Sequence, residues 1–281
     1  MLNMINMDLY RMFKSKSIYV VWIIMILFIG LSTVLMKAEV DDVSVQTENY
    51  EASQEGNSTE NANLGMSVIV PTQPGEKPNV FDLFYANVQG KIIALFLVIF
   101  TVLFATADIN NGYIKNIGGQ VKKRGNLVYS KIICMFLYSI ISMVLALAAQ
   151  MLANKLAFGS MAIGNIHHLI FYLGIQTLLH FALIVVVLSI AILIRNNVFS
   201  MIFAVCLCMN AMVVVYGVLD NLFHKAGVKN FNTFEYTVSG KIFLLPMEID
   251  AKIGANAMII AVVYILGFGL LSSTVFRKRD I

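Results

Sequence analysis

The chain has 281 residues, of which 59% are hydrophobic and 13% charged, and its mean hydropathy is +0.79. Soluble globular domains carry about 25% charged residues, so this composition nearly excludes a water-soluble enzyme and predicts an all-α polytopic membrane protein. The three cysteines lie inside apolar runs and exclude a disulfide framework, and the net charge of +4 is weak evidence for nucleic acid, which we do not expect as a partner.

Residues 1–17 are predicted to form an amphipathic helix that lies in the membrane interface. Its apolar residues recur at helical spacing, and its bases would face anionic lipid. Two roles remain open: an anchor that sets topology, or an elbow helix that also touches a cytoplasmic partner. The apolar positions are Leu2, Ile5, Leu9, Met12 and Phe13.

Six apolar runs are long enough, or nearly so, to cross a bilayer as helices. None contains proline, and none alternates apolar and polar residues as a barrel strand does. The first run is longer than the roughly 7–15 residues of a signal peptide core, so we expect a retained helix. The second is short and requires Lys91 to snorkel toward the outer surface. The predicted spans are 18–36, 88–107, 132–152, 169–194, 198–219 and 257–276.

The distribution of lysine and arginine predicts that both termini lie in the cytoplasm. In that orientation the inside segments hold twelve bases and three acids, and the outside segments hold eight bases and thirteen acids. We therefore expect a multi-pass protein of the cell membrane.

Residues 37–87 are predicted to form a large acidic extracellular loop, with nine acids and three of the four prolines. Residues 41–63 have almost no large apolar side chains and are expected to be poorly ordered. Residues 81–85 (FDLFY) are expected to form an amphipathic turn on the outer leaflet. The loop is either kept soluble by its charge or acts as an acidic cap that attracts or screens a cationic peptide.

Residues 108–131 are predicted to form a cytoplasmic loop with a short helical piece that carries an exposed apolar ridge. Glycines bracket the piece, and the basic run 122–124 follows it. The ridge favours docking into a groove on a soluble partner, while the bases alone fit a simple topology signal. The residues of this piece are Gly112, Tyr113, Ile114, Lys115 and Ile117.

Polar residues inside the predicted spans are few. Gln176 and His180 lie four residues apart on one face of the fourth span, and Asn210 lies mid-span in the fifth. Such residues either line a substrate path or pack helices through hydrogen bonds. A stripe of small residues on the third span predicts close helix contact: Ser139, Ser142, Ala146 and Ala149.

Residues 220–256 form an outside segment too long for a simple turn, and their apolar patches fit re-entrant or surface-lying helices. Motifs for covalent chemistry are missing from the sequence. The two Gly-Lys pairs are each followed by isoleucine and lack the upstream glycine of a phosphate-binding loop, and His167-His168 lacks an acid at metal-ligand spacing. We therefore expect no enzyme, no bound cofactor and no metal on this chain.

The order of these parts resembles the permease subunits of type-2 ABC exporters, notably those of lantibiotic-immunity and peptide-export systems. The resemblance lies in the N-terminal DLYR and FKSK segments (8–16), the NGYIKNIGG…LVYSK loop (111–131) and the RKR tail (277–279). It implies a separate cytoplasmic ATPase that holds ATP and magnesium, and a second permease that is either identical or paralogous. It also implies a peptide-like, antimicrobial or otherwise amphipathic substrate, exported across the lipid bilayer.

Under this resemblance residues 1–281 form one permease domain, and the piece at 112–117 is the coupling helix that receives ATPase motion. The substrate path would involve Gln176, His180 and Asn210. The extracellular gate would be formed by the turn Phe243, Leu244, Leu245 and Pro246. Two other classes remain open from the residues alone: a non-transporting membrane sensor or assembly protein, and an intramembrane enzyme.

Overall fold

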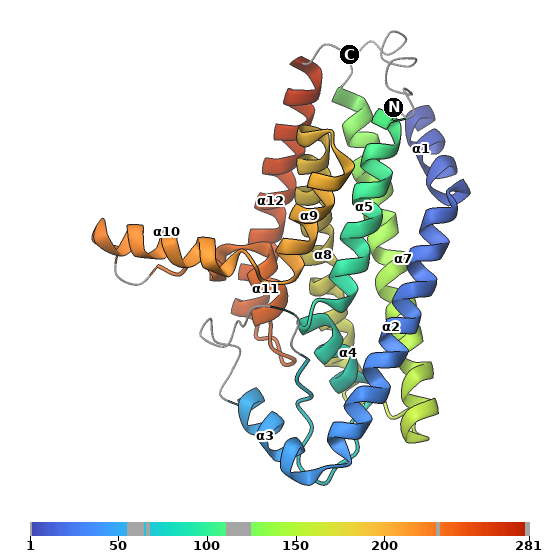
Figure 1. Cartoon of the computed structure of the whole chain (residues 1–281), viewed down its shortest axis with the longest axis vertical. Coiled ribbons are helices and arrows are strands. Elements are labelled where there is room, and N and C mark those ends of the chain that lie inside the picture. The colour runs from blue at the N-terminus through green and yellow to red at the C-terminus, as the bar shows by residue number, and fades with distance from the viewer. Residues whose placement is uncertain (1, 55–64, 66–67, 111–124, 229–230, 279–281) are drawn as a thin grey trace.

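The computed structural model describes residues 2–54, 65, 68–110, 125–228 and 231–278. These residues form helices and loops with no strand, which confirms the predicted all-α class for this part of the chain. The long helices stand side by side in a bundle, and the α1 start and α12 end lie at the same end of it (Figure 1). The elements are α1 (Leu2–Lys14), α2 (Lys16–Val40), α3 (Val43–Gln54), α4 (Val80–Gln89), α5 (Ile92–Asn110), α7 (Gly125–Phe158), α8 (Ile166–Ile194), α9 (Asn197–Cys208), α10 (Val213–Lys225), η2 (Thr233–Tyr236), α11 (Val238–Leu244) and α12 (Ala251–Lys278).

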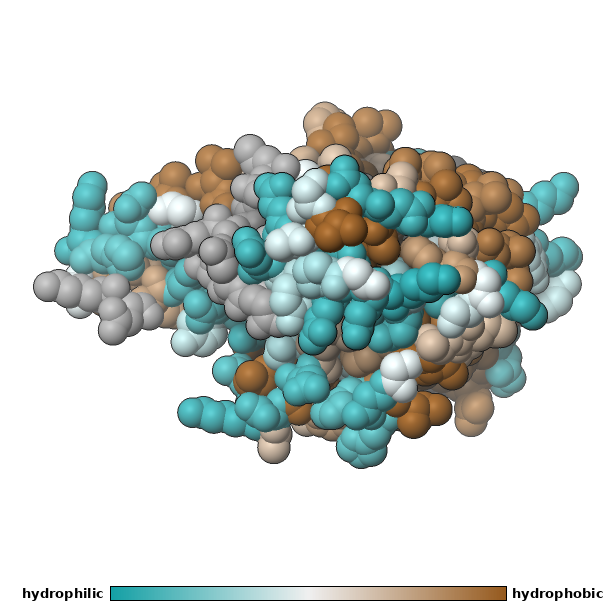
Figure 2. Space-filling model, turned by 90° about the horizontal axis from the view of Figure 1, so that it is seen from below, coloured by the Kyte–Doolittle hydropathy of each residue, from teal (hydrophilic) through white to brown (hydrophobic). Residues whose placement is uncertain are grey.

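Four described helices, α2, α7, α8 and α12, are each long and apolar enough to cross a membrane. The number rises to six if two bent pairs, α4 with α5 and α9 with α10, each count as one span. Length and composition therefore mark a membrane-embedded protein. Viewed from the end away from the termini, hydrophilic side chains cover much of the surface and hydrophobic ones gather toward its rim (Figure 2).

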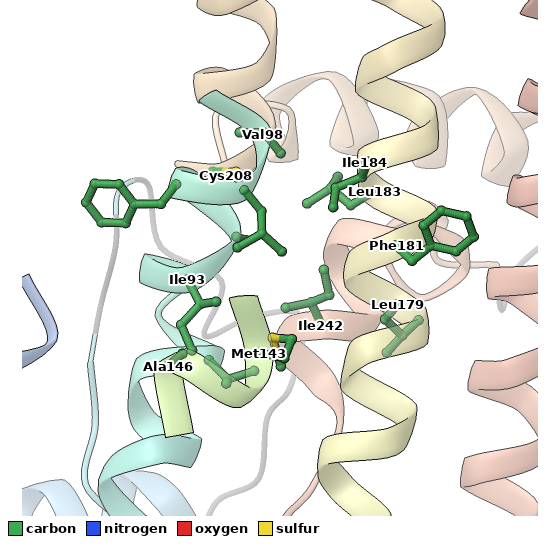
Figure 3. Close-up of a cluster of buried hydrophobic side chains, with 14 of the residues drawn as sticks. Ile93, Val98, Met143, Ala146, Leu179, Phe181, Leu183, Ile184, Cys208 and Ile242 are labelled. Carbon is green, nitrogen blue, oxygen red and sulfur yellow. The ribbon is translucent and has the colours of Figure 1, made fainter. Parts of the chain in front are cut away.

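The inner helices of the bundle are α5 and α8, and the outer ones are α2 and α12. Of the most apolar stretch of each, 72% is buried in α8 but 28% in α2 and in α12. A helix that is apolar all round is stable inside a bundle, while one with a bare apolar face suits contact with lipid. The central core draws side chains from most of the helices, and the part shown in Figure 3 includes Ile93 of α5, Met143 of α7, Ile184 of α8, Cys208 of α9 and Ile242 of α11.

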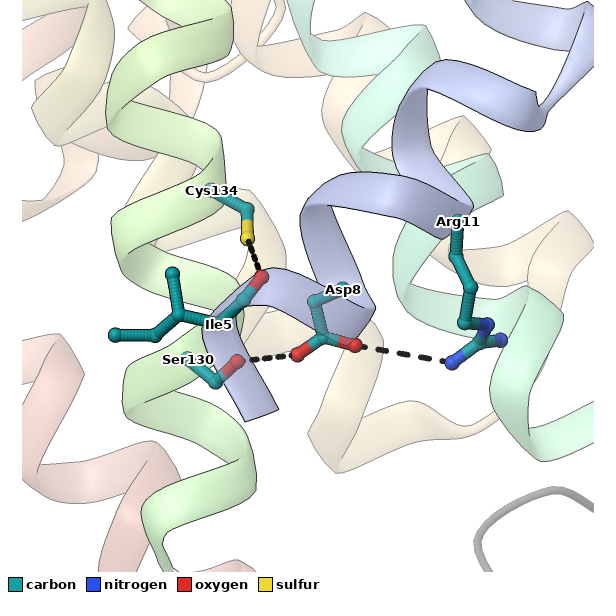
Figure 4. Close-up of polar contacts among 5 residues, drawn as sticks. All are labelled: Ile5, Asp8, Arg11, Ser130 and Cys134. Atoms are coloured by element: carbon teal, nitrogen blue, oxygen red, sulfur yellow. Dashed lines mark hydrogen bonds and ion pairs between the residues drawn. The ribbon is translucent and has the colours of Figure 1, made fainter. Parts of the chain in front are cut away.

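The N-terminal helix α1 packs against the beginning of α7 (Figure 4). The Ser130 hydroxyl donates to the Asp8 carboxylate at 2.5 Å, and Arg11 lies 3.7 Å from the other oxygen of that carboxylate. Asp8 is 1% exposed, so this polar contact is buried. The predicted N-terminal helix is confirmed as a helix, and it ends at Lys14; Ser15 separates it from α2, which begins at Lys16.

The predicted small-residue stripe of α7 is buried, as expected. Ser139, Ser142, Ala146 and Ala149 are all at most 9% exposed. The indole N–H of Trp22 on α2 donates to the Ser142 hydroxyl at 2.8 Å. The small side chains of α7 let α2 approach closely and leave the Ser142 hydroxyl accessible to it.

The prediction of a loop at residues 37–87 is wrong in three places. α2 continues to Val40, α3 occupies residues that we expected to be poorly ordered, and α4 contains the FDLFY stretch. Every residue of α4 is buried, so this stretch lies inside the protein rather than on a leaflet. A capping box at Asn79 and Asp82 begins α4, which explains why a helix starts there.

α3 is held in place by local polar contacts. Asp42 accepts hydrogen bonds from the backbone N–H and the hydroxyl of Ser44, and these bonds hold the pKa of the Asp42 carboxyl below its ordinary value. The Gln46 side chain, 3% exposed, donates to two backbone oxygens and accepts from the Gly75 N–H at 2.8 Å. Hydrogen bonds therefore order a segment that lacks large apolar residues.

The predicted spans 88–107 and 198–219 are not straight helices. α4 and α5 meet at an angle of 52°, and α9 and α10 meet at 70°. α10 points sideways out of the bundle and has no buried residue (Figure 1). α7 begins at Gly125, so the last residues of the predicted cytoplasmic loop belong to a helix.

Candidate functional site

The two bent helix pairs break at residues with left-handed backbone conformation. Lys91 has φ of 59° at the α4–α5 break, and Asn210 has φ of 53° at the α9–α10 break. Asparagine tolerates this conformation better than lysine does, and such positions persist only where surrounding contacts hold them. Here the contacts are between the two breaks themselves.

The Lys91 side chain joins the two breaks to α11. Its ammonium donates to the Asn210 side-chain oxygen and to the Ser239 hydroxyl, the latter at 2.7 Å. Ser239 in turn donates to the backbone oxygen of Leu207 at 2.9 Å, and the ammonium lies 5.7 Å from the centre of the Phe234 ring. We call this set of five residues the Lys91 junction.

Lys91 is 1% exposed, so the expectation that it snorkels to the surface is wrong. No described aspartate or glutamate pairs with it; its partners are neutral oxygens and an aromatic ring. A buried cation without an acid is costly in a membrane protein, and residues of this kind mark functional sites.

Gln176 and His180 form a second buried polar group on α8. The Gln176 amide donates to the Tyr172 hydroxyl at 3.1 Å and to the Ile242 backbone oxygen at 3.2 Å. The Nδ1 atom of His180 lies 2.8 Å from the Gln176 backbone oxygen. Because a carbonyl oxygen only accepts, Nδ1 carries the proton. Gln176 Oε1 and His180 Nε2 are buried and have no hydrogen-bond partner among the described residues.

The short helix α11 brings these groups together. Its residue Ser239 touches Lys91, and its residue Ile242, one turn later, accepts from Gln176. Asn210, which the sequence singled out, is thereby connected to Gln176 through one seven-residue helix. Sequence reasoning did not assign Lys91 or Ser239 to the site, because Lys91 stands at the start of an apolar run, where it was expected to snorkel, and Ser239 lies outside all of the runs.

The predicted gate turn overlaps the end of α11, because Phe243 and Leu244 are the last two residues of that helix. Phe243 and Leu245 are buried, and the Phe243 ring lies 6.1 Å from that of Phe234, the residue beneath the Lys91 ammonium. Leu244 and Pro246 are half-buried. The predicted gate and the predicted path residues therefore lie next to each other, on and around α11.

A cavity of about 400 Å³ opens beside the Lys91 junction. Helices α8, α9 and α12 supply most of the apolar wall, and α10, η2 and α11 with its N-cap supply hydroxyl groups. A cavity with apolar walls and a few hydroxyls suits an amphipathic molecule rather than an ion. Its polar residues are Tyr216, Thr233, Thr237, Ser239 and Tyr264.

The comparison with family models gives one match. Residues 55–281 match the family described as "Protein of unknown function (DUF2705)". The chain belongs to the DUF2705 family. A comparison with curated proteins found no match.

The DUF2705 match includes the whole Lys91 junction, together with Gln176, His180 and the cavity beside α11. α1, α2 and α3 precede it. The predicted coupling residues 112–117 lie outside the described residues, between the end of α5 and the start of α7. Among the residues that are described, no group of three His, Cys, Asp or Glu side chains could hold a metal ion.

Proposed function

We propose that this chain is the permease subunit of an ABC exporter that carries a peptide-like or otherwise amphipathic substrate across the cell membrane. The ATPase would be a separate cytoplasmic subunit, and a second permease, identical or paralogous, would complete the transporter. The proposal joins the resemblance in sequence to one structural observation: a buried cation at the meeting point of two broken helices.

Broken helices around a buried charge are the arrangement that transporters use at substrate sites. A helix break frees backbone groups to bind a ligand, and such breaks are tolerated at membrane depth only against protein or a cavity. The Lys91 junction combines two breaks, a cation and a neighbouring cavity.

α5 would transmit the motion of the ATPase to the Lys91 junction. It is a helix of 19 residues, about 28 Å long at 1.5 Å per residue. One end follows Lys91 directly, and the other precedes the predicted coupling residues 112–117 in the chain. Because α5 is packed on nearly every side, a push on the loop would move it as a rigid body. That motion would act on Lys91 and, through Ser239, on α11 and the gate turn.

The first experiment tests partner binding and transport separately. The neighbouring reading frames are searched for an ABC ATPase, which is then co-expressed with the chain, and the purified pair is placed in vesicles. The double variant Tyr113→Asp, Ile117→Asp puts charges on the apolar ridge, so we expect loss of the ATPase on purification. Lys91→Met keeps the ridge, so we expect the ATPase to remain bound while substrate-stimulated ATP hydrolysis is lost.

Lys252→Met is the matched control, because Lys252 is an exposed lysine at the start of α12. It should leave both measurements unchanged. Retention of the ATPase by the Tyr113→Asp, Ile117→Asp variant would contradict docking at this loop. Full substrate stimulation in Lys91→Met would refute the role of the junction and would favour a sensor or assembly protein.

A second experiment tests orientation. In a background without cysteine, single cysteines at Glu48 on α3 and at Lys278 on α12 are labelled with a membrane-impermeant maleimide. Both positions are exposed, and they lie at opposite ends of the bundle. We expect labelling of position 48 from outside intact cells and of position 278 only after lysis. The reverse pattern would overturn the proposed topology.

A further inference from the structure

A second cavity, of about 280 Å³, lies at the end of the bundle where α1 meets α2. One wall comes from the end of α1 and the start of α2, and the other from the last turns of α5. It is separate from the Lys91 junction, which lies at the opposite end of α5. Its two walls differ in chemistry.

The wall from α1 and α2 is cationic and rich in hydroxyls, with Arg11, Lys14, Ser15 and Ser17. Arg11 is oriented by Asp8 at 3.7 Å, and Lys14 by a hydrogen bond to the Tyr10 hydroxyl at 3.1 Å. Two cations and two hydroxyls on one wall form a set of donors that suits a phosphate group.

The wall from α5 is apolar, and it continues along the helix. Over residues 92–107 every side chain of α5 is buried except for one stripe of four partly exposed residues. They are spaced by four, so they lie on one face of the helix, and the last two of them line the cavity. An apolar track therefore leads from the phosphate-binding wall along the bundle. The stripe is Leu95, Ile99, Leu103 and Ala107.

The cavity also lies where a lipid headgroup would be. α2 begins beside it at Lys16 and is apolar and long enough to cross a membrane, so the cavity stands at the edge of the apolar layer. Its volume is near the lower end of the roughly 300–1,000 Å³ of small-molecule pockets, which fits a headgroup rather than a whole lipid. A soluble anion would use the cationic wall but not the apolar stripe.

The geometry points to a binding site for one anionic phospholipid: its phosphate sits between Arg11, Lys14 and the two serines, and an acyl chain follows the stripe on α5. The lipid would hold the α1–α2 elbow against α5. This site does not depend on the proposed transport function, because it is built from other residues and needs no ATPase.

The test uses the purified, delipidated full chain in nanodiscs of phosphatidylcholine with a rising fraction of phosphatidylglycerol. Native mass spectrometry counts the phosphatidylglycerol retained per chain. We expect one retained molecule on the wild-type protein. Each basic residue near an anionic surface contributes about 1 kcal/mol to binding. The loss of two should therefore weaken lipid binding by about 2 kcal/mol, which is about 30-fold at 1.4 kcal/mol per tenfold. The double variant Arg11→Gln, Lys14→Gln should show this loss.

Arg277→Gln, Lys278→Gln is the matched control, because it removes two exposed bases from the end of α12 on the same end of the bundle. It should retain the lipid. Ala107→Leu fills the cavity while keeping both cations and the Asp8 contact, so it should also lose the lipid. This variant decides the matter if Arg11→Gln, Lys14→Gln does not fold.

Four outcomes would overturn the proposal. The first two are equal loss of lipid in the control variant and full retention by Ala107→Leu. The third is equal retention of phosphatidylcholine and phosphatidylglycerol. The fourth is displacement of the lipid by millimolar inorganic phosphate, which would assign the cavity to a free anion. Transport and ATPase binding are not measured here, so none of these results bears on the proposed function.

Discussion

Gly240, in the middle of α11, should not tolerate even a methyl group. A Cβ atom at this position would lie 1.9 Å from the backbone oxygen of Phe234 in η2, and real Cβ atoms essentially never approach a heavy atom below 3.0 Å. One element must therefore shift by about 1.1 Å (3.0 − 1.9). The obstacle is backbone, which cannot rotate away as a flexible side chain would.

The direction in which Gly240→Ala changes the free energy of unfolding distinguishes the effect of this contact from that of helix propensity. Overpacking in a well-packed region costs about 1–3 kcal/mol, while replacing glycine by alanine inside a helix gains about 1 kcal/mol. We therefore expect Gly240→Ala to lower the free energy of unfolding by about 2 kcal/mol, since a carbonyl at this distance puts the cost at the upper end. Gly267 on α12 is the matched control, because nothing lies within 4 Å of its would-be Cβ.

The assay is thermal unfolding in detergent, followed with a fluorogenic maleimide that reacts when the buried thiols of Cys134 and Cys208 become exposed. At about 2–4 °C per kcal/mol, Gly240→Ala should lower Tm by roughly 4–8 °C. Gly267→Ala should leave Tm unchanged or raise it. If Gly240→Ala melts at the wild-type temperature or above, the close approach of α11 to η2 is absent from the folded protein.

Two further predictions concern single hydrogen-bonded side chains. Ser142→Ala removes the hydroxyl that Trp22 donates to, so it should cost about 0.6 kcal/mol and shift the emission of this sole tryptophan to shorter wavelength. Ser139→Ala, whose hydroxyl bonds to its own helix, should not shift it, and equal shifts in both variants would contradict the contact. Gln46→Ala breaks three hydrogen bonds that tie α3 to the chain before α4, so limited proteolysis of this segment should quicken about 30-fold, for a loss of about 2 kcal/mol. The exposed Glu48→Ala is its control, and equal cleavage rates would show that Gln46 does not hold α3.

The apolar helices could be predicted from sequence because their signal is local. Runs such as 132–152 and 169–194 lie inside the observed α7 and α8, and these helices extend beyond the predicted runs by a few residues. The two bends could not be predicted in this way. Gly90 precedes Lys91 and hints at a break, but the bend is held by Asn210 and Ser239, which lie 119 and 148 residues further along the chain.

The candidate site could be predicted only in part, because some of its residues have a local signal in the sequence and others do not. Gln176, His180 and Asn210 stand out as polar residues within apolar runs, and the structure places them around α11. Lys91 was misinterpreted because a lysine at the end of a run normally reaches toward water. FDLFY was placed on a surface because a short mixed stretch after an acidic loop carries no sign of the partners that bury it, such as Tyr172.

The shortness of α9 has a consequence for how the chain enters the membrane during synthesis. Twelve residues reach about 18 Å, well short of the roughly 30 Å hydrocarbon layer. In the bent form, the open backbone after Cys208 cannot rest in lipid, so α9 depends on α5 and α8, which pack against it. We therefore expect the bend at Asn210 to form only after Lys91 and Ser239 are in place to hold it.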